Sequence, residues 1–125
     1  MKNAVNWFEI PVTNYERAKT FYQTILSLEI TDFHMPEKNV EYGFFPHDEK
    51  SMGVGGAIMR MDEMNPSTDG STVYLNGGDD LNLALNKVVD AGGKVFIPKM
   101  PIGENGFIAQ FIDTEGNRVA LHSMN

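Results

Sequence analysis

The chain has 125 residues, of which 42% are hydrophobic and 22% charged, and its ten basic and seventeen acidic side chains give a net charge of -7. That length and composition fit one globular domain with its own core, while the negative charge disfavours nucleic acid and membrane surfaces as partners. The absence of cysteine excludes a disulfide scaffold and thiolate chemistry, and with neither a signal peptide nor a membrane-spanning apolar run we expect a cytoplasmic protein.

The first segment predicts a strand followed by a helix. Residues 7–12 form an apolar run broken only by Glu9, which suits a strand. The helix that follows is capped either by Thr13, in a capping box with Glu16, or by Asn14. Its apolar residues fall at the spacing of one helix face: Ala18, Phe21, Tyr22, Ile25 and Leu26.

Three further strands are expected before a polar linker. They are residues 29–35, 40–45 and 53–61, and prolines end the first two. The last of them contains Gly53, Gly55 and Gly56, which suit either the close approach of a ligand or backbone, or a β-bulge. Residues 62–70 are the most loop-like of the chain and form the linker.

A second strand–helix unit repeats the first. Four pairs of positions align without a gap: Trp7 with Val73, Asn14 with Asp80, Ala18 with Ala84, and Tyr22 with Val88. The agreement lies in the pattern more than in residue identity, and it indicates an internal duplication.

The second unit continues as the first did. Its strand is residues 72–76, and its helix, ended by Gly92 and Gly93, has the stripe Leu81, Ala84, Leu85 and Val88. Strands follow at residues 94–100, 106–113 and 118–122, with a hairpin turn at 113–117.

The order βαβββ therefore occurs twice in a single domain. One module spans residues 1–61 and the other residues 71–125, on either side of the linker at 62–70. The predicted class is α+β. Each helix covers one face of its sheet, and the remaining faces of the two curved sheets would enclose a cavity.

The chain resembles the vicinal oxygen chelate superfamily, which includes glyoxalase I, bleomycin-resistance proteins and extradiol dioxygenases. The segments that carry the resemblance are PVTNYERAKTFY, LNLALNKVVDAGGKV and DTEGNRVALHS, and they are closest to members labelled as related to lactoylglutathione lyase. The resemblance implies paired modules around a cavity, closed within one chain or across a dimer, and we expect a homodimer. These motifs are specific for the fold, but they give little information about the activity.

In metal-dependent members of that superfamily, the first and last strands of each module supply His, Gln or Glu ligands. Carried over by resemblance, three of these positions fall on Trp7, Val73 and Ala120. The fourth falls within residues 54–56, and the duplication points to Val54. None of these side chains can donate a lone pair to a divalent cation, so we predict no metal and no other cofactor.

Two polar residues lie beside these positions. Strand alternation puts Glu9 on the face of Trp7 and His122 on the face of Ala120, so both should line the cavity. They could act as an acid–base pair or orient a polar ligand group. Alternatively, Glu9 caps a loop or pairs with a surface cation, and His122 is a half-exposed end residue. The other two histidines, His34 and His47, are interpreted as surface residues.

The function expected from these observations is the binding of an unidentified small molecule without a metal, as in the bleomycin-resistance branch. The predicted cavity comprises Trp7, Glu9, Val54, Val73, Ala120 and His122, with Tyr74, Phe107 and Phe111 available to flank it. Two alternatives remain open. One is a metal-dependent lyase or isomerase of the lactoylglutathione lyase type, and the other is a non-catalytic dimeric interaction module.

Overall fold

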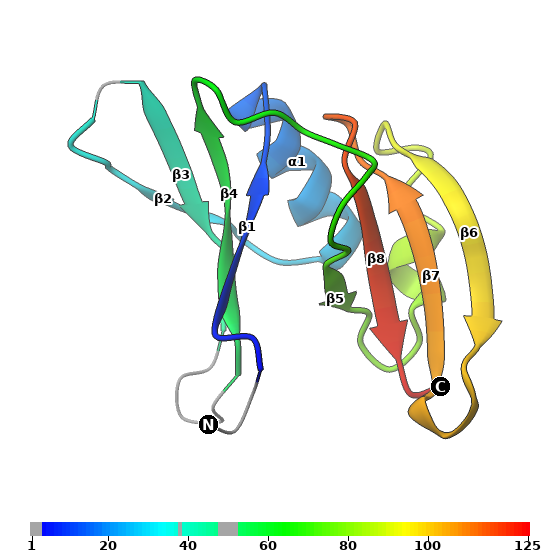
Figure 1. The fold of residues 1–125 in the computed structure, drawn as a ribbon. Helices are drawn as coiled ribbons and strands as arrows, with labels where there is room; N and C mark the ends of the chain where they lie inside the picture. The colour runs from blue at the N-terminus through cyan, green and yellow to red at the C-terminus, as the bar shows by residue number, and fades with distance from the viewer. Residues whose placement is uncertain (1–3, 38, 48–52) are drawn as a thin grey trace.

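The computed structural model describes residues 4–37, 39–47 and 53–125, and it confirms the α+β class with two four-stranded sheets (Figure 1). Sheet A has the order β1-β4-β3-β2 and comprises β1 (Trp7–Pro11), β2 (Thr31–Phe33), β3 (Val40–Phe44) and β4 (Gly55–Met61). Sheet B has the order β5-β8-β7-β6 and comprises β5 (Tyr74–Asn76), β6 (Lys94–Pro101), β7 (Phe107–Ile112) and β8 (Arg118–Ser123). In each sheet the first strand pairs in parallel with the last, and this repeated pairing matches the duplication.

Helix α1 (Tyr15–Leu26) begins at Asn14, whose side-chain oxygen accepts a hydrogen bond from the backbone N–H of Arg17 at 3.1 Å. The alternative capping box does not form, because Thr13 instead donates both its backbone N–H and its hydroxyl to Glu115 of the β7–β8 turn. The helix ends at Ser27, which adopts a left-handed conformation with φ 52°. One helix terminus is therefore capped from the other module.

A single hydrophobic core joins the two modules. Helix α1 lies between sheet A and sheet B (Figure 1), and its buried face contacts both. The ring of Phe21 lies 5.8 Å from that of Phe111 in β7, and the ring of Tyr22 lies 5.7 Å from that of Phe45, next to β3. Because the same helix face covers both sheets, neither sheet has a core of its own.

Several predicted elements are shorter than expected, most of all α2 and β2. Helix α2 (Asn82–Leu85) covers only the start of the predicted stripe, although Leu81 and Val88 are also buried. Asn86 and Asp90 favour turns over helix, so the segment continues as hydrogen-bonded turns up to Gly93. Likewise, β2 has three residues where residues 29–35 were predicted. A short three-residue helix, η2 (Gly103–Asn105), connects β6 to β7.

Each sheet leaves the face opposite the helices uncovered in the described part of the chain. Trp7 on sheet A and Tyr74 on sheet B remain 42% and 44% exposed. The uncovered faces therefore do not close into a sealed cavity within one chain, in contrast to the enclosed pocket expected from the sequence. No helix among the described residues is long and apolar enough to cross a membrane.

Candidate ligand-binding site

A cleft of about 770 Å³ separates the edge strands β1 and β5. Its walls come from both modules, and the end of α1 forms part of the lining. The apolar lining residues include Trp7, Phe8, Leu26, Leu28, Val54, Val73 and Tyr74. A volume and lining of this kind suit a small organic molecule.

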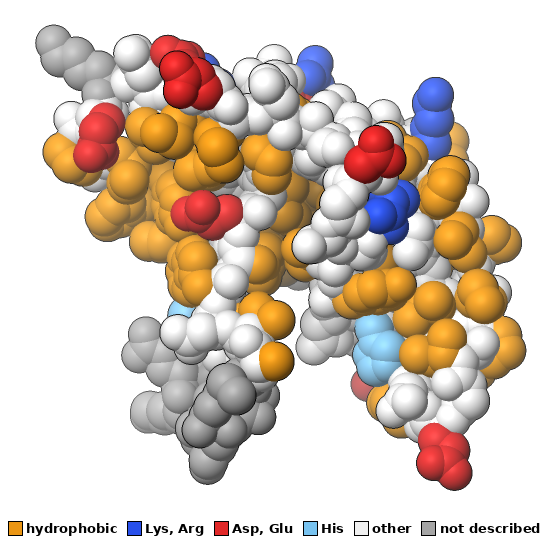
Figure 2. Space-filling model, in the orientation of Figure 1, with side chains coloured by type: hydrophobic (Ala, Val, Ile, Leu, Met, Phe, Trp, Pro, Cys, Tyr) orange, Lys and Arg blue, Asp and Glu red, His pale blue; other side chains and the backbone are white. Residues whose placement is uncertain are grey.

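The cleft adjoins the uncovered face of sheet A, which we call the Trp7 face. Strand alternation and register assign to it Trp7 and Glu9 of β1, Phe33 of β2, Val40, Tyr42 and Phe44 of β3, and Gly55, Ala57, Met59 and Met61 of β4. Figure 2 shows hydrophobic side chains gathered over this sheet, with an acidic side chain among them.

Four aromatic rings pack against one another across the Trp7 face. The Phe44 ring is central, with centroid distances of 5.8 Å to Trp7, 5.6 Å to Tyr42 and 5.1 Å to Phe33. Phe33 is nevertheless 46% exposed. A contiguous, exposed aromatic surface of this kind marks a binding surface more often than an ordinary protein exterior.

A chain of hydrogen bonds runs through the same face. The indole Nε1 of Trp7 donates to the hydroxyl of Tyr42 at 3.0 Å, and that hydroxyl donates to Oε2 of Glu9 at 2.6 Å. Burial and the Glu9 bond raise the pKa of Tyr42 above its ordinary value, against the opposing effect of the Trp7 bond. Tyr42 is therefore a neutral phenol near pH 7 and holds the Glu9 carboxylate in place.

Sheet B carries a second set of hydrogen-bonded polar side chains beside its exposed tyrosine. Its Gln110 donates from Nε2 to the Tyr74 hydroxyl at 3.2 Å, and Arg118 donates to Oε1 of Gln110 at 3.2 Å. His122 lies further along β8, where its Nε2 is 2.6 Å from the carbonyl oxygen of Asn105 and must carry the proton to donate. The edge strands β1 and β5 thus each place an aromatic ring beside the cleft, Trp7 and Tyr74. Each ring is hydrogen-bonded to a polar side chain of its own sheet.

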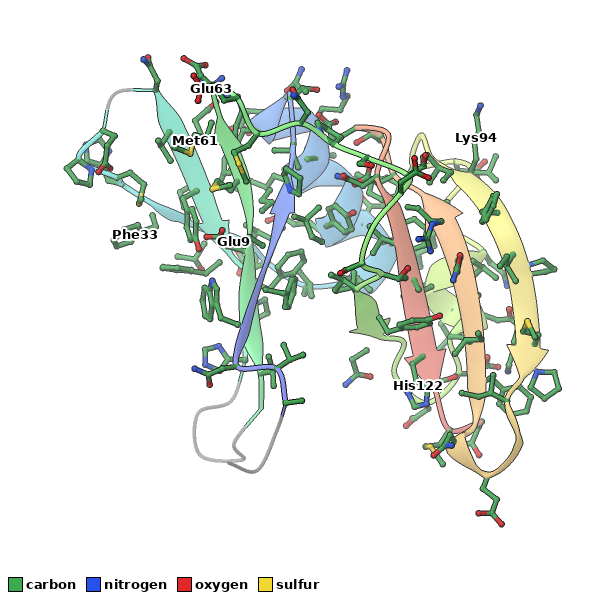
Figure 3. All side chains as sticks on the ribbon, viewed as in Figure 1. Glu9, Phe33, Met61, Glu63, Lys94 and His122 are labelled. Carbon is green, nitrogen blue, oxygen red and sulfur yellow. The ribbon has the colours of Figure 1, made fainter. Side chains whose placement is uncertain are left out.

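The structure separates the six cavity residues named from the sequence into three groups. Trp7, Val54 and Val73 line the cleft, and Glu9 lies on the Trp7 face. Ala120 is fully buried within sheet B. His122 belongs to sheet B, and Figure 3 shows it well away from Glu9. Within one chain the two residues do not form the acid–base pair considered above; the partner of Glu9 is Tyr42.

The metal-ligand position that the sequence placed on Val73, in the fifth strand, falls one residue later in the structure, on Tyr74. Tyr74, not Val73, is the direct partner of Ala120 in the parallel pair, so Tyr74 shares its face. Val73 instead packs against the core, in line with the buried Leu75. Because side chains alternate along a strand, a shift of one residue exchanges the two faces.

Sequence reasoning missed three residues of the site: Tyr42, His47 and Gln110. His47 is exposed, as interpreted from the sequence, but its ring also lies 6.3 Å from the Trp7 ring, and a Cβ on Gly55 would clash with both. The available signal was the alternation along β3, which puts Tyr42 on one face with Phe44. Using it requires the register of β3 against β4, which the sequence alone does not supply.

The model of the Glyoxalase/Bleomycin resistance protein/Dioxygenase superfamily matches residues 4–121. The chain belongs to this superfamily. A curated relative is CFP32 of Mycobacterium tuberculosis (strain CDC 1551 / Oshkosh), named provisionally as a glyoxylase. It is 27% identical over an alignment of 124 residues, which covers 96% of this chain and 45% of CFP32. The CFP32 of Mycobacterium bovis matches to the same extent. The chain thus spans about half the length of these relatives.

Solved structures of the superfamily share the fold. Glyoxalase I from Zea mays superposes with a TM-score of 0.71 at 19% identity, over 98% of this chain and 48% of that one. The fosfomycin resistance protein FosX from Listeria monocytogenes gives a TM-score of 0.66 at 13% identity, over 100% of this chain and 94% of FosX. A glyoxalase/bleomycin resistance protein from Albidiferax ferrireducens T118 gives a TM-score of 0.66 at 16% identity, over 98% of this chain and 100% of that protein.

The donor chemistry of this chain does not fit the metal of the metal-dependent superfamily members. On the observed register, the residues that occupy the four positions are the paired Trp7 and Gly55 and the paired Tyr74 and Ala120. They offer one phenol and no imidazole or carboxylate, whereas divalent metals in proteins take several such ligands. Among the described residues, no group of three or more His, Asp or Glu side chains is placed to hold a metal ion.

Proposed function

We propose that this superfamily member binds a small organic molecule in the inter-module cleft and over the Trp7 face, without using a metal. The observation that carries the proposal is the apolar cleft of about 770 Å³, which Trp7 joins to an exposed aromatic surface. Few polar groups accompany that surface, and they are fixed by hydrogen bonds, as is common in small-molecule sites. The lack of cysteine keeps the cytoplasm as the proposed compartment.

A homodimer is part of the proposal. Exposed aromatic residues on sheet A and exposed Tyr74 on sheet B would be covered if the Trp7 face of one copy met sheet B of another. The resulting chamber would surround a ligand from both sides. Sedimentation equilibrium should give twice the chain mass, and a strictly monomeric protein at about 100 μM would remove this part of the proposal.

Ligand binding can be tested through Trp7, which is the single tryptophan of the chain. Titration with benzyl alcohol, a small neutral aromatic probe, should change the Trp7 emission saturably and raise the melting temperature. Val54→Arg places a charge at the rim of the cleft and should weaken binding about tenfold. The control is Leu83→Arg, an equal change at a position that is 66% exposed on α2. Unchanged binding in Val54→Arg, or no saturable response at all, would refute the cleft as the site.

Metal independence has its own test. Nickel, zinc, cobalt and manganese are added singly to chelator-stripped protein, and no shift in melting temperature is expected. A metal present at 100 times its dissociation constant stabilises the native state by about 2.7 kcal/mol, which for this size means a shift of roughly 10 °C. A saturable shift of that order with any one metal would show that this protein does bind a divalent metal.

A further inference from the structure

We infer that the molecule recognised by the Trp7 face carries an organic cation, a quaternary or protonated amine, bound between the Glu9 carboxylate and the neighbouring aromatic rings. The inference rests on the proposed function and narrows the chemical class of the ligand.

The charge on this face is the first argument. Among the strand residues of the Trp7 face, Glu9 is the single charged side chain. The nearest basic residue of the sheet, Arg60, lies on the opposite face, where it pairs with Glu41 at 2.7 Å. The described residues therefore leave the Glu9 charge without an ion-pair partner.

Sheet B does not supply the missing cation within the chain. Arg118 lines a narrow crevice of about 130 Å³ that also reaches Glu9 and Asp69. Its guanidinium donates instead to the carbonyl oxygens of Thr68 and Gly70 and to the side chains of Thr72 and Gln110. These four bonds are all to neutral acceptors, and Arg118 forms no ion pair with Glu9 among the described residues.

The Glu9 carboxylate is also held in a fixed position. Tyr42 donates to Oε2, and the Trp7 indole N–H directs the Tyr42 proton toward Glu9 by occupying the oxygen of the same hydroxyl. No hydrogen bond among the described residues uses Oε1 of Glu9. A ligand can therefore reach a positioned, partly exposed anion with one oxygen free.

The rings around Glu9 favour the same class of ligand. Tyr42 contacts the carboxylate directly, Trp7 is hydrogen-bonded to Tyr42, and the Phe33 ring extends the aromatic surface 6.4 Å beyond the Tyr42 ring. Trp7 and Phe33 are both more than two-fifths exposed. An aromatic face attracts a cation through its quadrupole, and tryptophan does so best. A neutral ligand would leave the carboxylate unpaired beside an apolar surface, and an anion would be repelled.

The decisive experiment compares choline with 3,3-dimethyl-1-butanol, which has the same shape but carbon in place of the charged nitrogen. Trp7 emission is followed in the full chain. Choline should bind about tenfold or more tightly than the alcohol, and added salt should weaken choline alone. Glu9→Gln should remove most of the preference and leave only the part that the aromatic rings supply. Glu41→Gln removes an equal charge from the other face of the same sheet and should leave the full preference intact.

The outcomes separate this inference from the proposed function. Equal binding of the two probes, or a preference of the same size in Glu9→Gln as in the wild type, overturns the inference. Binding of benzyl alcohol alone also overturns it and leaves the proposed function standing. The absence of a response to all three probes removes both the inference and the proposed function. Preference for choline that depends on Glu9 supports the inference.

Discussion

Tyr22 places a phenol in the fully buried core, where its hydroxyl donates to Oδ2 of Asp113 at 2.6 Å. Burial raises the pKa of Tyr22 well above its ordinary value, and the charge and hydrogen bond of Asp113 raise it further. The bond joins α1 of the first module to the β7–β8 turn of the second. Asp113 also accepts hydrogen bonds from Asn117 and from the backbone of Glu115, so the carboxylate organises that turn.

Replacing Tyr22 by phenylalanine should lower the free energy of unfolding by about 2 kcal/mol, because a buried carboxylate loses a charge-assisted hydrogen bond. Urea denaturation measures the change. Tyr74→Phe is the matched control, since the Tyr74 hydroxyl is at an exposed residue, and its effect should stay within about 0.5 kcal/mol. Equal changes in the free energy of unfolding in the two variants would show that the buried Tyr22–Asp113 bond adds no extra stability.

Gly55 is the residue on which the geometry of the site depends most directly. A Cβ there would lie 2.6 Å from Nδ1 of His47 and 2.8 Å from an atom of the Trp7 ring, closer than real contacts allow. Gly55→Ala should therefore displace Trp7, alter its emission maximum and weaken benzyl alcohol binding about tenfold. Gly70→Ala, in the linker, is the comparison: its φ of 92° strains an alanine and lowers stability, but its Cβ meets no neighbour, so Trp7 emission and binding should not change. Wild-type emission and affinity in Gly55→Ala would contradict the assigned ring positions.

Among the elements, α1 depends most on the opposite module. Glu115, whose side chain is fully covered, accepts the backbone N–H of Thr13 and of Asn14 at 2.9 and 2.7 Å and pairs with Arg17 at 2.7 Å. Burial acts to raise the pKa of Glu115, but the Arg17 bond and the hydrogen bonds at the helix start outweigh it and lower the pKa to about 2. The carboxylate thus caps the positive end of the helix dipole from across the module boundary.

Glu115→Gln should destabilise the protein by about 2 kcal/mol near pH 7, since a neutral amide cannot replace the charge-assisted bonds. The folded-state pKa lies below the ordinary 4.5, so the carboxylate contributes its full stability above that value and loses it as the pH falls toward about 2. The difference between wild type and variant, measured by urea denaturation, should therefore shrink between these limits. A difference that stays constant down to pH 2 would be inconsistent with a lowered pKa.

The elements were largely predictable because their signals are local. Apolar alternation, proline ends and the helix stripe identified every strand and both helices, and Asn14 was one of the two caps considered. What escaped depends on distant partners: Glu115 at the start of α1, and the face of Tyr74. The separation of Glu9 from His122 belongs to the same class, because strand alternation places a side chain on a face and says nothing of where another sheet lies.

For the molecule as a whole, the shared core implies that the modules unfold together. Phe111 of the second module is fully buried and contacts Phe21 and Tyr22 of α1. Phe111→Ala should cost about 3–5 kcal/mol. The loss should appear equally in Trp7 emission, which reports on the first module, and in circular dichroism, which reports on both. A Trp7 midpoint unchanged by Phe111→Ala would mean that the modules fold independently.

The two surfaces of each sheet are consequently subject to different evolutionary constraints. A substitution at Phe21 or Tyr22 must suit two sheets at once, so change there requires compensating change in the other half of the chain. A substitution at Trp7, Phe33 or Tyr74 meets solvent or ligand and leaves the core intact. Chains that share this fold can therefore acquire new specificities on the open faces while the helix stripe stays nearly fixed. Among relatives of this chain, the open-face positions should vary with ligand and the α1 core positions should not.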